Sequence, residues 1–423
     1  MKRALVYSHD TFGLGNIRRM LAICEHVLEC IPDLSILLIT GSPMVHSFRL
    51  PQRLDYVKIP SITRPEREQY APKFLDIEMD DMMALRSSLI LSTVINFDPD
   101  LLLIDKKPQG VHNELESAFD YLRLHRPATK VALILRDILD SPAATRRTWR
   151  ENGYYPAIDA FYDLLLVLGT PEVFDTAREY GFPASIADKV RYCGYIGRGA
   201  GLKDRGEIRR ELRMSDGERL ALVTVGGGED GYRVLETYIA GLTHLPDGCR
   251  IHSLIIGGPE LPAAQRAMIA QAAARHPRVT VLEFTDDMMS YIAASDVVVS
   301  MGGYNTICEI LTAGRRAVIV PRARPVAEQW IRASRMADLG LFSAIHPDDL
   351  SPRALLDAVV GQIRSSDMPG SAGVDLGALP QVAGWVATLL RDAEREQSFH
   401  RANDQLIHFP VHQHAPTPRV RAR

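Results

Sequence analysis

Short apolar runs alternate with segments of helical periodicity along almost the whole chain, and this alternation restricts the possible folds more than any other feature. The apolar runs lie at residues 4–8, 35–39, 101–104, 130–135, 164–168, 220–225, 250–256, 279–284, 297–300 and 317–320. Within each run the apolar residues are largely continuous rather than alternating, which is typical of strands covered on both faces. The sequence therefore predicts an α/β protein with parallel sheets.

The order of strand, glycine-bearing turn and helix occurs near the start of the chain and again in its second half. The first run leads into a glycine-bearing loop at 11–15 and a helix expected at about 16–30, and the run 220–225 leads into the glycines 226–228 and a helix at about 231–243. Two such turns predict two Rossmann-like halves facing each other, with ligands beyond the carboxyl ends of the strands. A length of 423 residues also exceeds what one hydrophobic core usually supports.

Composition and charge exclude several classes of protein. The formal net charge of −3 is too small to indicate a nucleic-acid partner. The apolar runs are far shorter than the roughly 18–20 residues of a spanning helix, and residues 1–8 lack the features of a signal peptide. The five cysteines are scattered and odd in number, which favours a reducing compartment. We therefore expect a cytoplasmic protein with at most peripheral contact to the inner membrane face.

The segment 279–340 carries the clearest signs of a binding site. Gly302 and Gly303 would let the backbone approach a ligand, and the helix that follows them would present free amides to phosphate oxygens. Glu309 lies one turn into that helix and could bind ribose hydroxyls. Alternatively, Thr306 and Glu309 could form a capping box that satisfies only backbone amides. Spacing alone leaves both interpretations open.

This segment resembles the donor-binding half of the peptidoglycan-precursor N-acetylglucosaminyltransferase (MurG-like) family. The matching motifs, in order, are Glu283-Phe284-Thr285-Asp286-Asp287-Met288, Ser295-Asp296-Val297-Val298, Gly302-Gly303-Tyr304-Asn305-Thr306-Ile307-Cys308-Glu309, Ala313-Gly314, Val320-Pro321 and Glu328-Gln329. The run from Ser8 to Arg19 resembles an uncharacterised branch of predicted glycosyltransferases. The resemblance implies the GT-B fold, in which two Rossmann-like domains with parallel sheets face each other across a cleft.

On this basis we expect four consecutive parts of the chain. They are an N-terminal acceptor domain at 1–193, a C-terminal donor domain at 194–365, a linker and helix at 366–397, and a basic tail at 398–423. As in relatives, the helix at 378–397 would cross back to the first domain, and 194–203 would connect the two domains. The tail is either disordered or in contact with an anionic membrane surface.

The resemblance also implies a donor site. Phe284 and Thr285 would lie at the nucleobase, Glu309 at the ribose, and Glu328 with Gln329 at the sugar hydroxyls. Arg198 would lie near the phosphates, or it could be only a surface arginine of the linker. The full set of expected donor-binding residues is Gly13, Gly15, Arg198, Gly226, Gly227, Gly228, Phe284, Thr285, Met288, Gly302, Gly303, Asn305, Thr306, Glu309, Glu328 and Gln329.

The catalytic candidates lie in the first domain. Relatives carry a histidine where this chain has Asn16, which cannot take a proton. His9 is the nearest histidine that could replace it, or it could merely fix the loop. Asp105 and Asp137 follow predicted strands, so they should face the cleft and could act as bases. Each lies next to a basic residue, so both could equally form local ion pairs that hold loops.

The expected reaction is transfer of a hexose-type sugar from a nucleoside-diphosphate sugar, most simply a UDP-sugar, to an acceptor hydroxyl with inversion. No cofactor and no essential metal are expected, since Asp98-Pro99-Asp100 is better interpreted as a strand start than as a metal-binding motif. The alternatives are a nucleotide-sugar 2-epimerase or hydrolase on the same fold, or a catalytically quiet nucleotide-sugar-binding subunit. The acceptor, whether lipid-linked or a small molecule, would contact loops such as 60–82 and 138–160.

Overall fold

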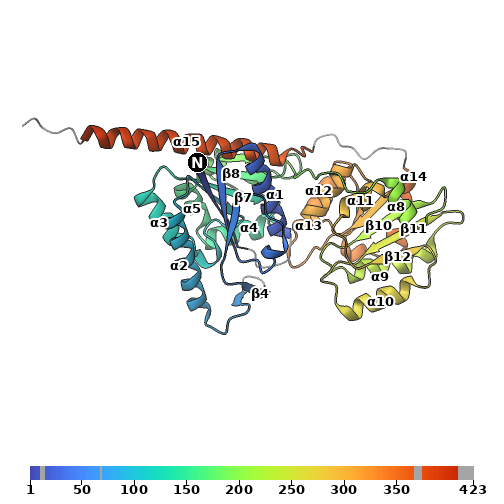
Figure 1. The fold of residues 1–423 in the computed structure, drawn as a ribbon. Helices are drawn as coiled ribbons and strands as arrows, with labels where there is room; N and C mark the ends of the chain where they lie inside the picture. Colours follow the sequence, from blue (N-terminus) through green and yellow to red (C-terminus); the bar gives the residue numbers. More distant parts are fainter. Residues whose placement is uncertain (10–14, 67–68, 366–373, 408–423) are drawn as a thin grey trace, which may run out of the picture.

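The computed structural model describes residues 1–9, 15–66, 69–365 and 374–407, which form two α/β domains (Figure 1). The first sheet contains β1 (Lys2–Ser8), β2 (Leu34–Thr40), β3 (Leu54–Lys58), β6 (Leu101–Asp105), β7 (Lys130–Arg136), β8 (Leu164–Leu168) and β9 (Val190–Tyr192). Its strands are all parallel, in the order β3-β2-β1-β6-β7-β8-β9. The strand order therefore reverses direction between β1 and β6.

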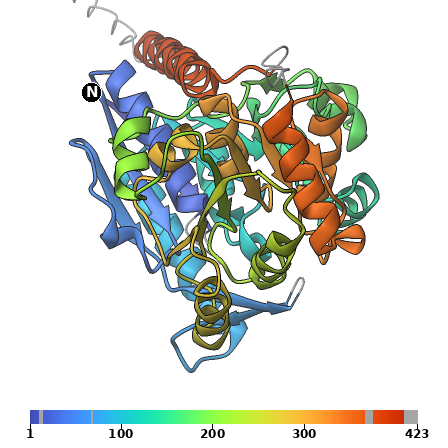
Figure 2. The ribbon, with the colours of Figure 1, turned by 90° about the vertical axis from the view of Figure 1, so that its right-hand side faces the viewer.

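The second sheet repeats this plan. It contains β10 (Arg219–Thr224), β11 (Ile251–Ile256), β12 (Val279–Leu282), β13 (Val297–Ser300), β14 (Ala317–Ile319) and β15 (Ser343–Ala344). These strands are also parallel, in the order β12-β11-β10-β13-β14-β15. In Figure 2 this second domain lies in front of the first. The predicted pair of Rossmann-like domains with parallel sheets is confirmed.

Helices cover both faces of each sheet (Figure 1). The helices of the first domain are α1 (Gly15–Cys30), α2 (Met79–Phe97), α3 (Glu116–His125), α4 (Pro142–Glu151), α5 (Tyr154–Phe161), α6 (Thr176–Glu179) and α7 (Ala184–Ala187). Those of the second are α8 (Arg205–Glu211), α9 (Tyr232–Gly241), α10 (Ala263–Ala273), α11 (Met288–Ala294), α12 (Tyr304–Ala313), α13 (Glu328–Asp338) and α14 (Pro352–Arg364). A short antiparallel hairpin, β4 (Ile62–Glu66) and β5 (Gln69–Pro72), lies within the expected acceptor loop 60–82.

The continuous apolar strands are explained by burial on both faces. In β1, Ala4 and Val6 belong to one hydrophobic cluster, and Leu5 and Tyr7 belong to another on the opposite face. All four side chains are fully buried. Such a strand has no polar face, because successive side chains point to opposite sides of the sheet and both sides are covered.

Two chain segments connect the domains and pair with each other. The Tyr195 amide donates to the Asp375 carbonyl (2.7 Å), and the Gly197 amide donates to the Leu376 carbonyl (3.0 Å). The last helix, α15 (Ala378–Ile407), then packs against α1 of the first domain (Figure 1). The crossover between the domains is therefore a paired double connection.

The predicted end of the last helix at 397 is wrong, because α15 continues to Ile407. Lys130 pairs with Glu396, and Gln397 donates to Asp100 (2.9 Å), so the helix is anchored to the first domain where the tail was expected to begin. Residues 408–423 lie outside the described part of the chain. Among the described residues, no helix has both the length and the apolar character needed to cross a membrane.

Candidate active site

The turn between β10 and α9 requires glycine at position 228. Gly228 has φ +101°, and a Cβ there would lie 2.3 Å from the Gly257 carbonyl oxygen. Gly226 has φ +68°, again in the left-handed region that favours glycine. The turn therefore packs directly on the loop that follows β11, and the Glu260 amide donates to the Gly227 carbonyl (2.7 Å). The loop after β11 was not among the predicted site segments, although Gly257-Gly258 marks it in the sequence.

The turn between β13 and α12 leaves the start of the helix open. Gly302 has φ +74°, and Gly303 is the N-cap of α12. No side chain in the described part of the chain caps this helix, and Thr306 is its third residue rather than its N-cap. The capping-box alternative for Thr306 and Glu309 is therefore wrong. The first amides of α12 are available to an anionic ligand.

The two glycine turns border one hollow, which is open to solvent. Of the expected donor residues, it is lined by Gly226, Gly227, Gly228, Gly303, Thr306 and Gln329. The sequence did not predict the other polar lining residues, which are Glu229, Asp230, Glu260, Ser300 and Arg322.

Glu309 lies on α12 and is 6% exposed. Among the described residues it makes no recorded hydrogen bond or ion pair, so its carboxylate has unused acceptors. Burial raises the pKa of Glu309, although Arg18 and Arg198 act in the opposite direction. Arg198 donates to the Asn305 side-chain oxygen (2.8 Å), and the Asn305 side-chain nitrogen Nδ2 donates to the Gly15 carbonyl (3.3 Å). Arg198 therefore lies against α12, in contrast to the surface position that was the alternative.

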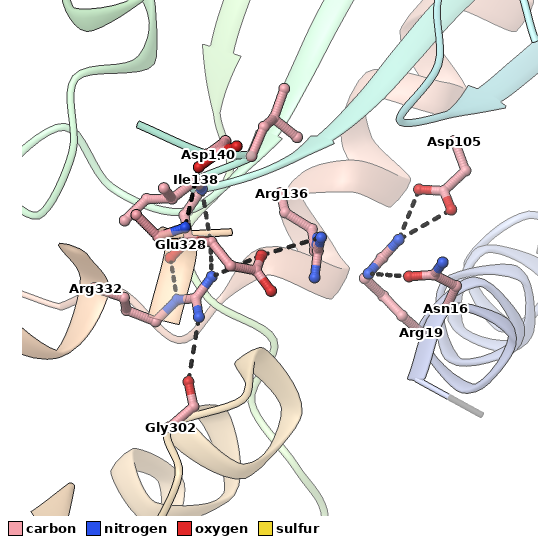
Figure 3. A network of polar contacts seen from close by, with 12 residues as sticks. Asn16, Arg19, Asp105, Arg136, Ile138, Asp140, Gly302, Glu328 and Arg332 are labelled. Carbon is pink, nitrogen blue, oxygen red and sulfur yellow. Dashed lines mark hydrogen bonds and ion pairs between the residues drawn. The ribbon is translucent and has the colours of Figure 1, made fainter. Parts of the chain in front are cut away.

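Glu328 and Gln329 begin α13, where it meets the first domain. The Gln329 side-chain oxygen accepts from the Arg322 amide (2.9 Å). Glu328 pairs across the cleft with Arg136 at the end of β7 (3.1 Å), as Figure 3 shows. Burial raises the pKa of Glu328, but the surrounding cations, Arg136 foremost, lower it by a larger amount. The pKa of Glu328 is therefore lowered overall.

Asp137 forms a buried ion pair that joins the domains. Its two carboxylate oxygens accept from Arg332 of α13 at 2.7 Å each, and one also accepts from the Tyr195 hydroxyl (2.9 Å). Both charged side chains are fully buried, and Arg332 also donates to the Gly302 carbonyl (3.2 Å, Figure 3). Arg332 was not among the residues predicted from the sequence, although it lies one helical turn after Glu328. The alternative of a local ion pair between Asp137 and Arg136 is wrong.

Asp105 is held in the same manner within the first domain. Arg19 of α1 donates to both of its oxygens, at 2.7 and 3.0 Å, and donates to the Asn16 side-chain oxygen at 3.3 Å (Figure 3). The alternative of a local ion pair between Asp105 and Lys106 is therefore wrong as well. Both candidate carboxylates are committed to guanidinium groups.

His9 follows β1 and is 3% exposed. Its Nδ1 atom has no hydrogen-bond partner among the described residues, which do not include 10–14 of the adjacent loop. Burial lowers the pKa of His9 well below its usual value, and four nearby cations, Lys107 and Lys106 foremost, lower it further. The imidazole is therefore neutral at physiological pH.

The residues expected at the nucleobase lie beyond β12, which ends at Leu282 and not at Phe284 as predicted. Phe284 is 56% exposed, and the Thr285 hydroxyl accepts from the Asp287 amide (3.1 Å). Met288 begins α11 and packs against the core. Gly13 lies outside the described residues.

Asp98 and Asp100 have structural partners. The Arg3 amide donates to Asp100 (2.9 Å) and the Arg3 guanidinium donates to Asp98 (2.7 Å), just before β6 begins. This agrees with the interpretation of the motif as a strand start.

Comparison with solved structures identifies the architecture. MurG of Acinetobacter baumannii aligns with a TM-score of 0.60 and 15% identity, over 92% of this chain and all of that one. The calicheamicin glycosyltransferase CalG4 aligns with a TM-score of 0.56 and 15% identity, over 96% and 98% of the two chains. UDP-GlcNAc 2-epimerase of Methanocaldococcus jannaschii aligns with a TM-score of 0.60 and 10% identity, over 92% and 100%. The chain therefore has the GT-B fold, which occurs in transferases and epimerases alike.

Sequence similarity is narrower and favours the transferases. Residues 222–368 match the glycosyltransferase family 28 C-terminal domain. The chain is 28% identical over 182 residues to the UDP-N-acetylglucosamine–N-acetylmuramyl-(pentapeptide) pyrophosphoryl-undecaprenol N-acetylglucosamine transferase of Haemophilus influenzae, over 43% of this chain and 50% of the relative. It is 25% identical over 230 residues to an uncharacterized glycosyltransferase of Methanopyrus kandleri, over 54% and 61%. The matches thus span about half the length of these relatives, and the predicted resemblance to the MurG-like glycosyltransferases is confirmed.

Proposed function

We propose that this protein is a glycosyltransferase that moves a hexose-type sugar from a nucleoside-diphosphate sugar to an acceptor hydroxyl, with inversion. The observation that carries the proposal is the hollow between the two glycine turns, which the uncapped start of α12 borders. Backbone amides and a helix start suit a diphosphate, because both direct N–H groups and positive partial charge at its oxygens.

Two further residues, which are not among those lining the hollow, have proposed roles. Glu309 would accept hydrogen bonds from the ribose hydroxyls, since this residue of α12 is buried and its carboxylate has no partner among the described residues. Arg198 would offset charge on the departing diphosphate, a role that suits a permanent cation. The acceptor oxygen would form its bond to the anomeric carbon as the bond to the diphosphate breaks. No group beyond the nucleotide sugar is required for this displacement.

A UDP-sugar is the proposed donor. The names of the Haemophilus relative and of the epimerase neighbour both contain UDP-linked N-acetylglucosamine. We propose that the acceptor approaches from the first domain, where the β4–β5 hairpin lies within the loop 60–82. The name of the Haemophilus relative specifies a lipid-linked acceptor, which makes such an acceptor, at the cytoplasmic membrane face, the first to test.

A 2-epimerase is the second candidate, because its fold matches as well as that of the transferases. Incubation with UDP-N-acetylglucosamine alone separates the two functions. An epimerase would equilibrate the donor with its 2-epimer, whereas a transferase would consume the donor only slowly until an acceptor is added.

The direct test is a thermal-shift screen with UDP, GDP and dTDP. A ligand at about 100 times its dissociation constant should stabilise the protein by about 2.7 kcal/mol. We expect UDP to give the largest increase in Tm and uridine alone to give much less, because the glycine turns are proposed to bind the diphosphate. If none of the nucleotides changes Tm or produces heat in calorimetry, the proposed function is wrong.

A further inference from the structure

Two side chains in the first domain lie where the strand order reverses. His9 directly follows β1 and Lys106 directly follows β6, and these neighbouring strands are the ones at which the sheet changes direction. In open α/β sheets the crevice beyond such a pair of strands is the usual ligand-binding position. On the proposed function, which this inference assumes, the acceptor hydroxyl would enter the cleft from this side.

Lys106 has an unusual backbone and an unpaired side chain. Its φ is +67°, a left-handed conformation that few non-glycine residues adopt and that tends to occur at functional sites. The described part of the chain provides no recorded hydrogen bond or ion pair for its amine. The adjacent carboxylate of Asp105 is bound on both oxygens by Arg19, and Glu328 is paired with Arg136.

The charges around Lys106 favour loss of its proton. The pKa of half-buried Lys106 is lowered to about 7, first by removal from water and then by Arg136 and Lys107. Glu328 and Asp105 oppose this effect only in part. Near neutral pH the Lys106 side chain is therefore a free amine in a substantial fraction of the molecules. A proton acceptor works best when its pKa is near the working pH.

The other candidate bases are less suited to accept a proton. Asp105 and Asp137 each receive two hydrogen bonds from a guanidinium group. Asn16 has no basic group. A proton on His9 would create a cation next to Lys106, Lys107, Arg86 and Arg19 in a buried position, which explains why its pKa is so low.

We propose that the free amine of Lys106 accepts the proton of the acceptor hydroxyl, while neutral His9 hydrogen-bonds to that hydroxyl and orients it. The O–H electron pair forms the new bond to the anomeric carbon, and the electrons of the breaking bond leave with the nucleoside diphosphate. The proton remains on Lys106 as an ammonium and is later released to solvent. Every atom and charge in this step comes from the acceptor, the donor and the lysine.

The decisive variant is Lys106→Arg, which keeps a positive charge but cannot accept a proton at neutral pH. The measurement is release of UDP from UDP-N-acetylglucosamine with water as the acceptor, as a function of pH. We expect the wild-type rate to fall tenfold per pH unit below about pH 7, and Lys106→Arg to lose at least about 100-fold in kcat with unchanged UDP affinity. Lys203→Arg, the same exchange at the exposed linker, should retain full activity.

A second variant distinguishes loss of the amine from loss of folding. Lys106→Gly suits the left-handed backbone at this position, so it should keep its Tm and lose activity, and added propylamine should restore part of the rate. If Lys106→Arg is active, the lysine binds an anionic group and is not a base. If the wild-type rate shows no decline below about pH 7, the inference also fails.

Competitive acetylation followed by mass spectrometry tests the amine without turnover. Lys106 should be half-maximally labelled near pH 7, whereas Lys203, whose pKa is raised by its hydrogen bond to Glu211, should react only at higher pH. Equal profiles for the two lysines would overturn the inference. Failure of the proposed function would appear separately, as absence of UDP binding to the wild-type protein.

Discussion

Glu309 and Glu328 are both buried in the second domain, yet their surroundings shift their pKa values in opposite directions. Glu309 has no recorded partner in the described chain, and burial raises its pKa. Glu328 lies among Arg136, Arg332 and Lys106, and its pKa is lowered. The difference separates two kinds of carboxylate, because an unpaired one retains acceptors for a ligand whereas a paired one serves the structure.

Replacing Glu309 with glutamine should weaken UDP binding and raise the free energy of unfolding. Hydrogen bonds to a charged group contribute about 1.5–3 kcal/mol, so UDP affinity should fall about 10- to 100-fold in calorimetry. A carboxyl whose pKa is raised on folding weakens the folded state above its ordinary pKa. The variant should therefore be more stable than the wild type at pH 7–8, and this advantage should vanish below about pH 4.

The control for this prediction is Glu236→Gln, the same change on the exposed surface of α9, where Glu236 accepts from Tyr232. It should alter neither UDP affinity nor the pH dependence of unfolding. Unchanged UDP binding by Glu309→Gln would remove this residue from the donor site.

At the scale of elements, the strand-to-helix turns decide where a ligand can approach. Gly226 and Gly228 both have positive φ, but their surroundings differ. A Cβ at 226 would meet nothing within 4 Å, whereas a Cβ at 228 would collide with the Gly257 carbonyl oxygen at 2.3 Å. The first position requires glycine only for its backbone conformation, and the second requires it also for space.

These two glycines give a matched pair of substitutions. Gly226→Ala should cost about 1 kcal/mol in the free energy of unfolding, because it imposes left-handed strain alone. Gly228→Ala should cost about 2–4 kcal/mol, because the turn and the loop after β11 must also separate. Urea denaturation of the two variants measures the difference. Equal losses would show that the turn moves freely against that loop.

At the scale of the whole molecule, the domains are joined by more than the paired crossover. Arg332 and Asp137 form a fully buried ion pair across the cleft, Arg136 and Glu328 form a second pair, and the Ala327 amide donates to Asp140 (3.0 Å). A buried charge that loses its partner is strongly destabilising. These contacts therefore help to fix the relative orientation of the domains.

Arg332→Met should lower the free energy of unfolding by about 3–5 kcal/mol, because it leaves the Asp137 carboxylate buried beside Tyr195 without its cation. The double variant Asp137→Leu/Arg332→Leu should recover much of this loss, because no charge remains buried. Urea denaturation measures the energies, and small-angle scattering should show a larger radius of gyration for Arg332→Met alone. A loss below about 1 kcal/mol would mean that water reaches this site.

The sequence determined the strands and turns that depend only on residues close together in the chain. The run at 164–168 coincides with β8, since five continuous apolar residues fit only a strand buried on both faces. The edge strands β3, β9 and β15 were missed, because edge strands need less apolar surface and β3 carries Asp55 and Lys58. The glycine turns after β10 and β13 were also predictable, since positive φ at Gly226, Gly228 and Gly302 is a property of single residues.

Only the tertiary structure decided which charges meet. Asp105 and Asp137 stand beside basic residues in the sequence, yet their partners are Arg19 and Arg332, which are 86 and 195 residues away. Side-chain pairing depends on which ends of strands and helices lie close together in the folded protein. The spacing of two residues in the sequence does not predict the distance between their side chains. The chain thus specified its fold and the glycine turns of the proposed nucleotide-sugar site through local rules, whereas its buried ion pairs were decided by the tertiary structure, within the first domain for Asp105 and between the domains for Asp137.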